Sequence, residues 1–264
     1  MVATMLVTGG TGTLGRSVVV GLRRAGVPVR VLSRHPSGPD DGVEYRAADL
    51  STGAGVESAV EGAETIVHCA GSAKGDEEKA RRLVAAATRV GAKHLISISV
   101  VGADAIPVVS RIDRAMFGYF AAKHGAERAV GEGEVPWTIL RATQFHDLVL
   151  TVTRQMAKLP LIPVPSGFRF QPVDSGAVAD RLVELALGDP AGLVPDIAGP
   201  RVYEMGELLR SYLRAAGRRR LTVPIHVPGR AAAAIRSGAT LAPTRGTGPT
   251  WEAFLAGHLA DTPH

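Results

Sequence analysis

The stretch Thr8-Gly9-Gly10-Thr11-Gly12-Thr13-Leu14-Gly15 decides the fold of this chain. It follows the apolar run Met5–Val7 and opens a helical pattern. Gly9 permits a tight turn, Gly12 lets the backbone approach a pyrophosphate closely, and Gly15 lets the helix pack against the strand. The free N–H groups at the start of such a helix bind phosphate. The stretch therefore predicts a dinucleotide-binding strand–turn–helix, and the alternative is an ordinary glycine-rich turn.

The residues after a second apolar run, Val29–Leu32, indicate which dinucleotide binds. A site for NAD(H) places Asp or Glu about 20 residues beyond the glycines, where it binds the ribose 2′-hydroxyl. Here Ser33 and Arg34 follow the run, and the next acidic residue is Asp40. A guanidinium can bind a 2′-phosphate through two hydrogen bonds. We therefore expect NADP(H) in preference to NAD(H). The alternative for Arg34 is an exposed position in a loop.

Short apolar runs and longer helical patterns alternate as far as Leu140. The runs are almost free of charged residues, as in strands buried on both faces of a parallel sheet. This alternation predicts an α/β fold, with a Rossmann-type, doubly wound parallel sheet. The further runs are Val43–Tyr45, Ile66–Cys69, Leu95–Ile98 and Trp137–Leu140, and the helical patterns are Leu14–Ala25, the short Val56–Val60, Asp76–Val90 and Arg111–Val130.

The rhythm changes after residue 142, where prolines become dense. We expect residues 1–142 to form the NAD(P)-binding Rossmann domain. Residues 143–264 are expected to form a smaller C-terminal substrate lobe that packs on it and does not fold independently. The elements predicted here are a helix over Ala177–Leu187, a strand over Val194–Ala198, a helix over Met205–Ala216, a strand over Leu221–Ile225, a helix that includes Ala231–Ala234, and a last helix from about Trp251.

Other residues near the expected strand ends are candidates for contact with the dinucleotide. Asp49 and Leu50 follow the third run and could flank the adenine, and the small residues after the fourth run would let a ribose lie against the backbone. Cys69 is better explained as a packed small apolar residue than as a nucleophile. The full candidate set for cofactor contact from these positions is Gly9, Thr11, Gly12, Thr13, Leu14, Gly15, Ser33, Arg34, Asp49, Leu50, Cys69, Ala70 and Gly71.

A candidate acid–base group lies in Tyr119-Phe-Ala-Ala-Lys123. A separation of four residues puts both side chains on one face of a helix. An ammonium near a phenol lowers the pKa of the phenol, so Tyr119 is predicted as the general acid. Ser99 follows the fifth run, at the edge of the sheet where reactive crevices lie, and could orient a carbonyl. The alternative for Tyr119 and Lys123 is a surface pair on an amphipathic helix.

The segment that follows the sixth run predicts a substrate pocket. Gln144, Phe145 and His146, together with the later Phe168, could line an apolar, aromatic cavity. The alternative for His146 is a buried, hydrogen-bonded histidine. The eight histidines show no metal-ligand spacing, so we predict no metal site.

Composition limits the class of protein. The single cysteine excludes an internal disulfide and fits a reducing compartment. There is no secretory signal pattern and no long uncharged apolar stretch, so we expect a cytoplasmic protein. The net charge is +5, and its tightest cluster is Arg218-Arg219-Arg220. That cluster could form a nucleic-acid patch, but a solvated helix end followed by a turn is the preferred interpretation.

Taken together, these motifs resemble the short-chain dehydrogenase/reductase superfamily, and in detail its atypical, NmrA-like branch of NAD(P)-binding proteins. The glycine stretch, Ser99 and Tyr119-x-x-x-Lys123 carry the superfamily resemblance. The branch resemblance rests on the segments Lys123–Val130, Trp137–His146, Phe170–Asp174, Val178–Asp180 and Thr250–Leu255.

The resemblance implies an NADPH-dependent oxidoreductase that transfers hydride to a small carbonyl, quinone or enone-like substrate. It implies that Ser99 and Tyr119 contact the substrate oxygen and that Lys123 also binds the nicotinamide ribose. The expected partner is a small-molecule substrate, without nucleic acid or membrane, for a monomer or homodimer. The alternative is a non-catalytic, NAD(P)-sensing regulatory protein that binds a protein partner. An epimerase or dehydratase of nucleotide sugars ranks below both, because the chain is short for such a lobe.

Overall fold

The computed structural model describes residues 4–36, 42–71, 75–243 and 246–260, which form two compact units. Unit 1 comprises the residues up to Ser99 together with Gly118–Arg141 and Gly176–Pro195. Unit 2 comprises Val100–Phe117, Ala142–Ser175 and the residues from Asp196. The chain therefore passes between the units several times, whereas the sequence rhythm placed one boundary at residue 142. Sequence pattern locates elements along the chain, but it does not show which unit receives a late helix or strand. Asp40 lies outside the described residues.

Unit 1 is built on a seven-stranded sheet in the order β3-β2-β1-β4-β5-β6-β9. The pairs β1–β2, β1–β4, β2–β3, β4–β5 and β6–β9 are parallel. All seven residues of β5 are buried, as expected for a strand covered on both faces. The strands are β1 (Thr4–Thr8), β2 (Val29–Ser33), β3 (Val43–Ala47), β4 (Ala63–His68), β5 (His94–Val100), β6 (Trp137–Ala142) and β9 (Gly192–Leu193).

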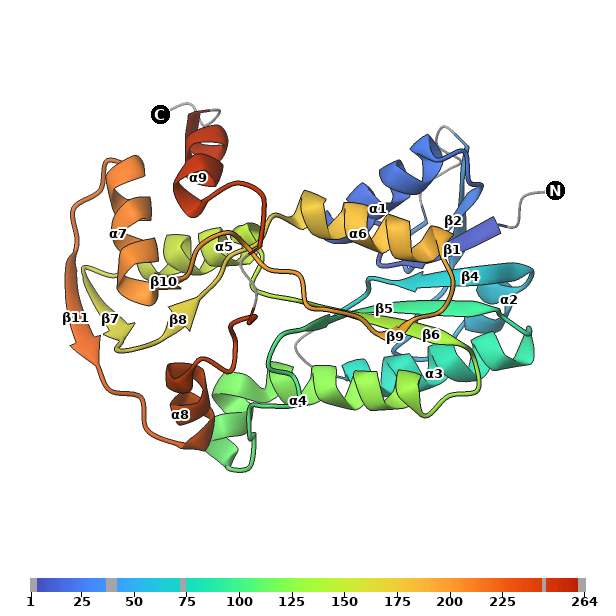
Figure 1. The fold of residues 1–264 in the computed structure, drawn as a ribbon, viewed down its shortest axis with the longest axis horizontal. Helices are drawn as coiled ribbons and strands as arrows, with labels where there is room; N and C mark the ends of the chain where they lie inside the picture. The colour runs from blue at the N-terminus through green and yellow to red at the C-terminus, as the bar shows by residue number, and fades with distance from the viewer. Residues whose placement is uncertain (1–3, 37–41, 72–74, 244–245, 261–264) are drawn as a thin grey trace. The chain divides into compact units, whose positions relative to one another are not determined.

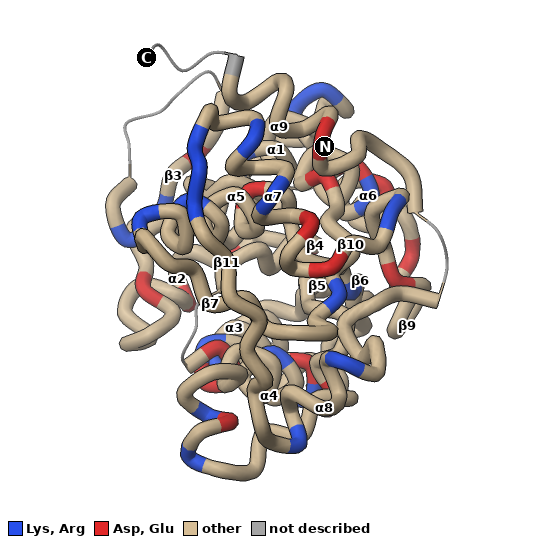
Figure 2. The backbone as a smooth tube through the Cα atoms, turned by 90° about the vertical axis from the view of Figure 1, so that its left-hand side faces the viewer, with Lys and Arg blue, Asp and Glu red and all other residues tan. Residues whose placement is uncertain are grey.

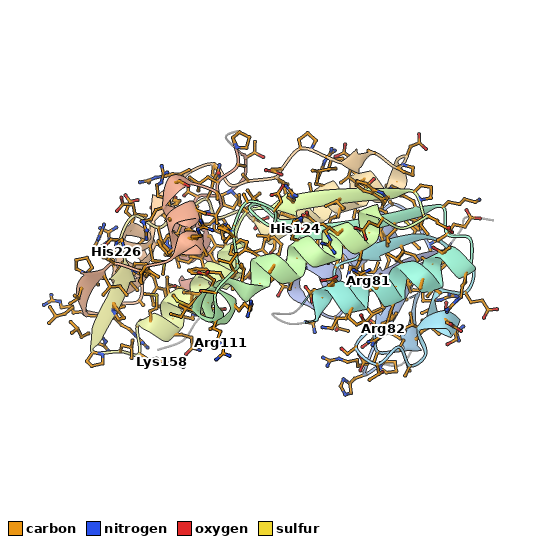
Figure 3. The ribbon with its side chains drawn as sticks, turned by 90° about the horizontal axis from the view of Figure 1, so that it is seen from below. Arg81, Arg82, Arg111, His124, Lys158 and His226 are labelled. Atoms are coloured by element: carbon orange, nitrogen blue, oxygen red, sulfur yellow. The ribbon has the colours of Figure 1, made fainter. Side chains whose placement is uncertain are left out.

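Helices cover both faces of this sheet (Figure 1). α1 and α6 lie on one face, while α3 and the later part of α4 lie side by side on the other, as Figure 3 also shows. α1 buries Leu14, Val18 and Leu22, which recur every four residues and form one apolar stripe. The helices that contribute to unit 1 are α1 (Thr13–Arg24), α2 (Val56–Val60), α3 (Asp76–Arg89), α4 (Arg111–Gly131) and α6 (Ser175–Leu187).

The strand order creates a switch point between β1 and β4. From β1 the chain builds outward through β2 to β3, and from β4 it builds in the opposite direction through β5 and β6. In an open parallel sheet, ligands bind outside the carboxyl ends of the strands at such a point. This arrangement confirms the predicted Rossmann-type, doubly wound fold, and it puts the glycine turn after β1 at the ligand-binding edge.

The described residues of unit 2 form four helices, besides the start of α4, and two small sheets. β7 (Leu161–Pro165) pairs with β11 (Leu221–Ile225) in parallel, and β8 (Arg169–Phe170) pairs with β10 (Tyr203–Glu204) in antiparallel orientation. The indole of Trp251 is fully buried and donates a hydrogen bond to the Leu208 carbonyl at 3.1 Å. The helices are α5 (His146–Met156), α7 (Met205–Ala215), α8 (Arg230–Ser237) and α9 (Trp251–Ala260), besides the start of α4.

Two local predictions differ from the structure. The strand expected over Val194–Ala198 is wrong, because β9 pairs with β6 only over Gly192–Leu193, and Ile197 adds a single bridge to Ala142. The helix α5 was not predicted from the sequence, because its residues adjoin the proline-dense segment. The first proline in that segment is Pro160, so a helix over His146–Met156 ends before any proline can break it. No helix of the described residues is long and apolar enough to cross a membrane.

Candidate cofactor and active site

The turn between β1 and α1 accepts only glycine at two of its positions. Gly9 has φ +69°, and a Cβ there would lie 2.7 Å from the backbone nitrogen of Ala70. A Cβ on Gly15 would overlap the Gly9 carbonyl oxygen. Gly12 donates its N–H to that same carbonyl at 3.0 Å and precedes the first residue of α1. The turn therefore packs backbone against backbone between β1 and β4, with the N-terminus of α1 open to an anion.

A pocket of about 510 Å³ lies in front of this turn, within unit 1. It brings together candidate residues from the ends of β1, β2, β3 and β4, as a dinucleotide requires. Thr13, Leu14 and Gly15 do not line it, since Leu14 and Gly15 are buried behind the turn. Its lining consists of Gly9, Thr11, Gly12, Leu32, Ser33, Arg34, His35, Ala48, Asp49, Leu50, Ser51, Cys69, Ala70, Gly71 and Lys79.

The charged groups of this pocket are mostly cationic. Arg34 follows β2, and Lys79 comes from the first turns of α3. Asp49 is the carboxylate of the lining, and its Oδ1 accepts the backbone N–H of Ser51 at 2.8 Å. That hydrogen bond, assisted by the charges of Arg34 and Lys79, holds the pKa of Asp49 below its ordinary value. The pocket thus suits a ligand that carries phosphates.

Lys123 of α4 lies beside Gly71, a residue of the pocket lining. Its side chain is buried, and a Cβ on the pocket residue Gly71 would lie 2.9 Å from its Nζ. The ammonium pairs with Asp76, whose Oδ2 lies 3.2 Å away, and Lys79 Nζ lies 3.8 Å from the other oxygen of Asp76. Asp76 is the first residue of α3, where a negative charge is favoured by the helix dipole. The predicted cofactor contact of Lys123 stays a prediction, but its position beside the pocket is consistent with it.

The environment of Tyr119 differs from the expected one. Lys123 Nζ lies 5.8 Å from the centre of the Tyr119 ring, and its charge is compensated by Asp76. Partial burial, with the Asp76 charge as a second cause, raises the pKa of Tyr119 to about 12, although 39% of the residue is exposed. The predicted lowering of this pKa by Lys123 is therefore wrong. Spacing along a helix shows that two side chains share a face, but it does not show that a third residue neutralises one of them.

Ser99 lies near the carboxyl end of β5 and is 6% exposed. Its Oγ has no hydrogen-bond partner among the residues that the structure describes. A buried hydroxyl without a partner is costly unless a ligand or water supplies one. Ser99 is therefore a suitable group to bind a polar atom, as predicted, although its contact with a substrate stays a prediction.

Cys69 behaves as an inert thiol. Burial raises its pKa to about 12, against the opposing effect of the Lys123 charge. A thiol that keeps its proton is a poor nucleophile. Within the described residues no group of His, Cys, Asp and Glu could hold a metal ion.

The four predicted substrate-pocket residues belong to unit 2 and are tied into its interior. Gln144 donates to the Thr240 carbonyl at 3.2 Å and accepts the Gln171 N–H at 3.1 Å. Phe145 bridges to Val173 just before α5, and Phe168 is buried near the ring of Phe117. Their role in binding substrate stays a prediction.

The surroundings of His146 differ from those expected for a buried, hydrogen-bonded histidine. It is fully buried, and its ring stacks on Phe254 at 4.8 Å and on Trp251 at 6.0 Å between ring centres. Neither ring nitrogen has a hydrogen-bond partner among the described residues. Burial lowers its pKa to about 4. In this structure His146 acts as an aromatic packing residue rather than as the hydrogen-bonded histidine that was the alternative.

Sequence reasoning missed Lys79 and Asp76. Both lie in the helical pattern that begins at Asp76, where an acidic first turn is ordinary. The one available signal was that Asp76 is an acidic residue at the start of a predicted helix, shortly after the glycine Gly71 that follows a predicted strand. Its burial and its pairing with Lys123 arise only when α3 and α4 pack together.

Comparison with known proteins agrees with the geometry. A family model described as NAD(P)H-binding matches residues 9–187. A (4-alkanoyl-5-oxo-2,5-dihydrofuran-3-yl)methyl phosphate reductase of Streptomyces griseus is 31% identical over 150 residues, which are 56% of this chain and 50% of that protein. The chain thus matches about half the length of that relative. A ceramide reductase of Caulobacter vibrioides is 28% identical over 243 residues, which are 84% of this chain and 74% of the relative.

Among solved structures, an NADPH-dependent quinone oxidoreductase of Escherichia coli in complex with NADPH shares the fold. Its TM-score is 0.79 at 17% identity, and the match covers 97% of this chain and 100% of that one. The residues that match the NAD(P)H-binding family model include the glycine turn, the pocket residues and Lys123. The family model confirms the predicted NAD(P)-binding family, and the solved structure confirms the predicted fold. The chain belongs to the NAD(P)H-binding family.

Proposed function

We propose that this protein is an NADPH-dependent oxidoreductase that reduces a small carbonyl, quinone or enone-like substrate. The observation that carries the proposal is the pocket in front of the glycine turn, with Arg34 and Lys79 in its lining. Ser33 and Arg34 stand after β2, where an NAD(H) site would place a carboxylate. The carboxylate of Asp49 already accepts a hydrogen bond from the Ser51 N–H. This distribution of charge supports NADP(H) over NAD(H). The reductase names of the relatives support the reaction class.

The reduced nicotinamide, when bound, supplies a hydride to an electrophilic carbon of the substrate. Ser99 orients the substrate oxygen through its otherwise unpaired hydroxyl, and Tyr119 donates the proton that this oxygen needs. Lys123 holds the ribose beside Gly71. Tyr119 carries its proton at neutral pH, as tyrosine ordinarily does, so the hydroxyl has a proton to give to the oxyanion.

The test is oxidation of NADPH in the presence of a panel of quinones, enones and small aldehydes. We expect turnover with at least one class, and at least a tenfold loss of kcat in Tyr119→Phe with unchanged NADPH affinity. Phe120→Leu, which changes the neighbouring aromatic residue of the same helix and removes no hydroxyl, is the control. If wild type and Tyr119→Phe turn over alike, Tyr119 has no part in the mechanism.

A non-catalytic dinucleotide sensor is the second candidate, and the raised pKa of Tyr119 favours it, because the same shift makes the phenol a weak acid. A sensor needs the glycine turn and the pocket but no proton donor. Tight NADPH binding without turnover on any substrate of the panel, and unchanged by Tyr119→Phe, would select the sensor over the enzyme.

A further inference from the structure

The outer face of the β7–β11 sheet is apolar and uncovered. The parallel register pairs Leu161 with Leu221 and Pro163 with Val223. Alternate residues of a strand share a face, and Ile162 is fully buried on the inner one. Leu221 is 73% exposed, Leu161 51% and Val223 41%. Isolated exposed aliphatic residues are ordinary, but here they form a continuous patch on two neighbouring strands.

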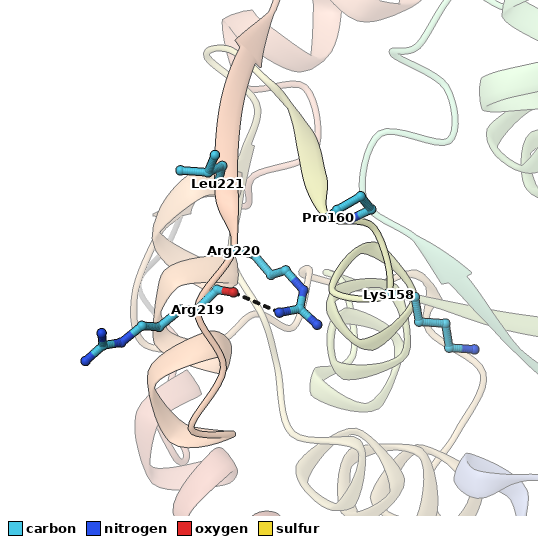
Figure 4. A pocket seen from close by; sticks show the side chains of 5 residues that line it. All are labelled: Lys158, Pro160, Arg219, Arg220 and Leu221. Atoms are coloured by element: carbon cyan, nitrogen blue, oxygen red, sulfur yellow. Dashed lines mark hydrogen bonds between the residues drawn. The ribbon is translucent and has the colours of Figure 1, made fainter.

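Cations are gathered at the start of the same two strands. Lys158 precedes β7, and Arg218–Arg220 lead directly into β11, which Figure 2 shows as blue at the start of the strand and tan along it. Together with Pro160 and Leu221, three of these residues line a hollow of about 380 Å³ in unit 2 (Figure 4). None of the four cations forms an ion pair with a described residue. His226 follows β11 at the far end of the strand, away from Lys158 (Figure 3).

The cationic groups do not converge on one point. The side chains of Arg219 and Lys158 point in opposite directions, and Arg220 turns back to donate to the Arg219 carbonyl at 2.8 Å (Figure 4). A single small anion would need groups aimed at a common centre. Positive charges spread along the edge of an apolar face instead match an extended surface that has an anionic outer layer over an apolar interior.

We propose that the β7–β11 face and its cations dock this protein on the surface of an anionic lipid bilayer, although the family resemblance implies no membrane partner. Basic residues near such a surface are attracted to its negative potential, while aliphatic side chains enter the boundary between head groups and acyl chains. A second copy of the chain would bring an equally cationic surface, which disfavours self-association through this face. No aromatic side chain belongs to the patch, whereas single-stranded nucleic acids are bound by stacking on aromatic residues.

The experiment is co-sedimentation of the full chain with phosphatidylcholine vesicles, with and without phosphatidylserine. Wild type is expected to bind only the vesicles that contain phosphatidylserine, and salt is expected to weaken that binding. Each basic residue at such a surface contributes roughly fivefold, so R218Q/R219Q/R220Q should bind about a hundredfold more weakly. L221S/V223S, which changes exposed side chains alone, should also bind less.

The matched control removes the same charge elsewhere. Arg24→Gln, Arg89→Gln and Lys93→Gln together change three exposed cations of unit 1, and this variant should bind the vesicles nearly as wild type does. NADPH affinity, equal in all variants, checks that each is folded. Equal vesicle binding by wild type and R218Q/R219Q/R220Q overturns the proposal. So does a dimer in solution that L221S/V223S dissociates, or binding to nucleic acid without binding to vesicles.

Discussion

The ammonium of Lys123 lies 3.2 Å from Oδ2 of Asp76, and neither side chain is more than 7% exposed. The pair joins the start of α3 to α4 beside the pocket residue Gly71. Burial of Tyr119 raises the pKa of its hydroxyl, and the negative charge of Asp76 raises it further. The ion pair therefore holds Lys123 beside the pocket, and its carboxylate adds to the pKa shift of Tyr119.

Removing the carboxylate should destabilise unit 1. We expect Asp76→Asn to lower the free energy of unfolding by about 3 kcal/mol, because the buried ammonium of Lys123 loses its counter-charge. Urea unfolding of both proteins measures the difference. Glu57→Gln is the control, since it removes the partner of Arg89 in an exposed pair and should change the free energy by less than about 1 kcal/mol. Equal changes in the free energy of unfolding for the two substitutions would show that the buried ion pair contributes no more to stability than the exposed one.

Substitution of the last glycine of the turn should disrupt the pocket. We expect Gly15→Ala to weaken NADPH binding at least about tenfold and to cost roughly 1–3 kcal/mol of stability, because its Cβ would overlap the Gly9 carbonyl. Isothermal calorimetry measures the binding. Gly257→Ala, in α9 with nothing within 4 Å of its Cβ, should instead be neutral or slightly stabilising. Unchanged NADPH binding by Gly15→Ala would contradict the proposed cradle.

Arg34 should discriminate between the two pyridine nucleotides. Arg34→Ala is expected to weaken NADPH binding about ten- to hundredfold, since a charge-assisted hydrogen bond to a 2′-phosphate is lost. NADH binding should change about twofold or less, because NADH has no such phosphate. The two dissociation constants, measured by fluorescence titration, give the ratio. Arg24→Ala, an exposed change in the last turn of α1, serves as control. A parallel loss for both nucleotides would remove Arg34 from phosphate recognition.

The buried His146 should make the protein sensitive to acid. Its pKa falls to about 4 because of burial, against the favourable charges of Asp174 and Asp147 and with a further lowering from His258. In the unfolded chain an ordinary histidine has a pKa near 6.5, so between these values the unfolded state binds more protons. Stability is therefore fully present above about pH 6.5 and is lost as the pH falls towards 4.

His146→Phe should remove this share of the acid sensitivity. From about pH 7 to pH 5 the wild type is expected to lose roughly 2 kcal/mol more stability than the variant does. Urea unfolding at the two pH values measures the difference. His226→Gln, at an exposed position after β11, is the control for the loss of one histidine. An identical pH dependence in wild type and His146→Phe would show that His146 does not act in this way.

Much of unit 1 follows from local sequence. The strands β1 to β6 and helices α1 to α4 lie within a few residues of their predicted bounds, because buried parallel strands and amphipathic helices leave distinct patterns in the chain. The glycine turn was also predictable, since the positive φ of Gly9 and the packing of Gly15 on the Gly9 carbonyl are local, whereas the contact of Gly9 with Ala70 comes from the fold. The short β9 and the helix α5 were not, because a two-residue strand has no periodicity and α5 adjoins a proline-dense segment.

The sequence by itself determined the Rossmann-type sheet, the glycine turn and the NAD(P)-binding family, because each rests on residues that are close together in the chain. Only the tertiary structure decided that α6 and β9 belong to unit 1 and that Lys79 lines the pocket. It alone decided that Asp76 forms an ion pair with Lys123. These relationships join residues from different helices and strands, and their energies depend on burial and on distances between groups. No local pattern encodes such distances, so folding alone establishes them.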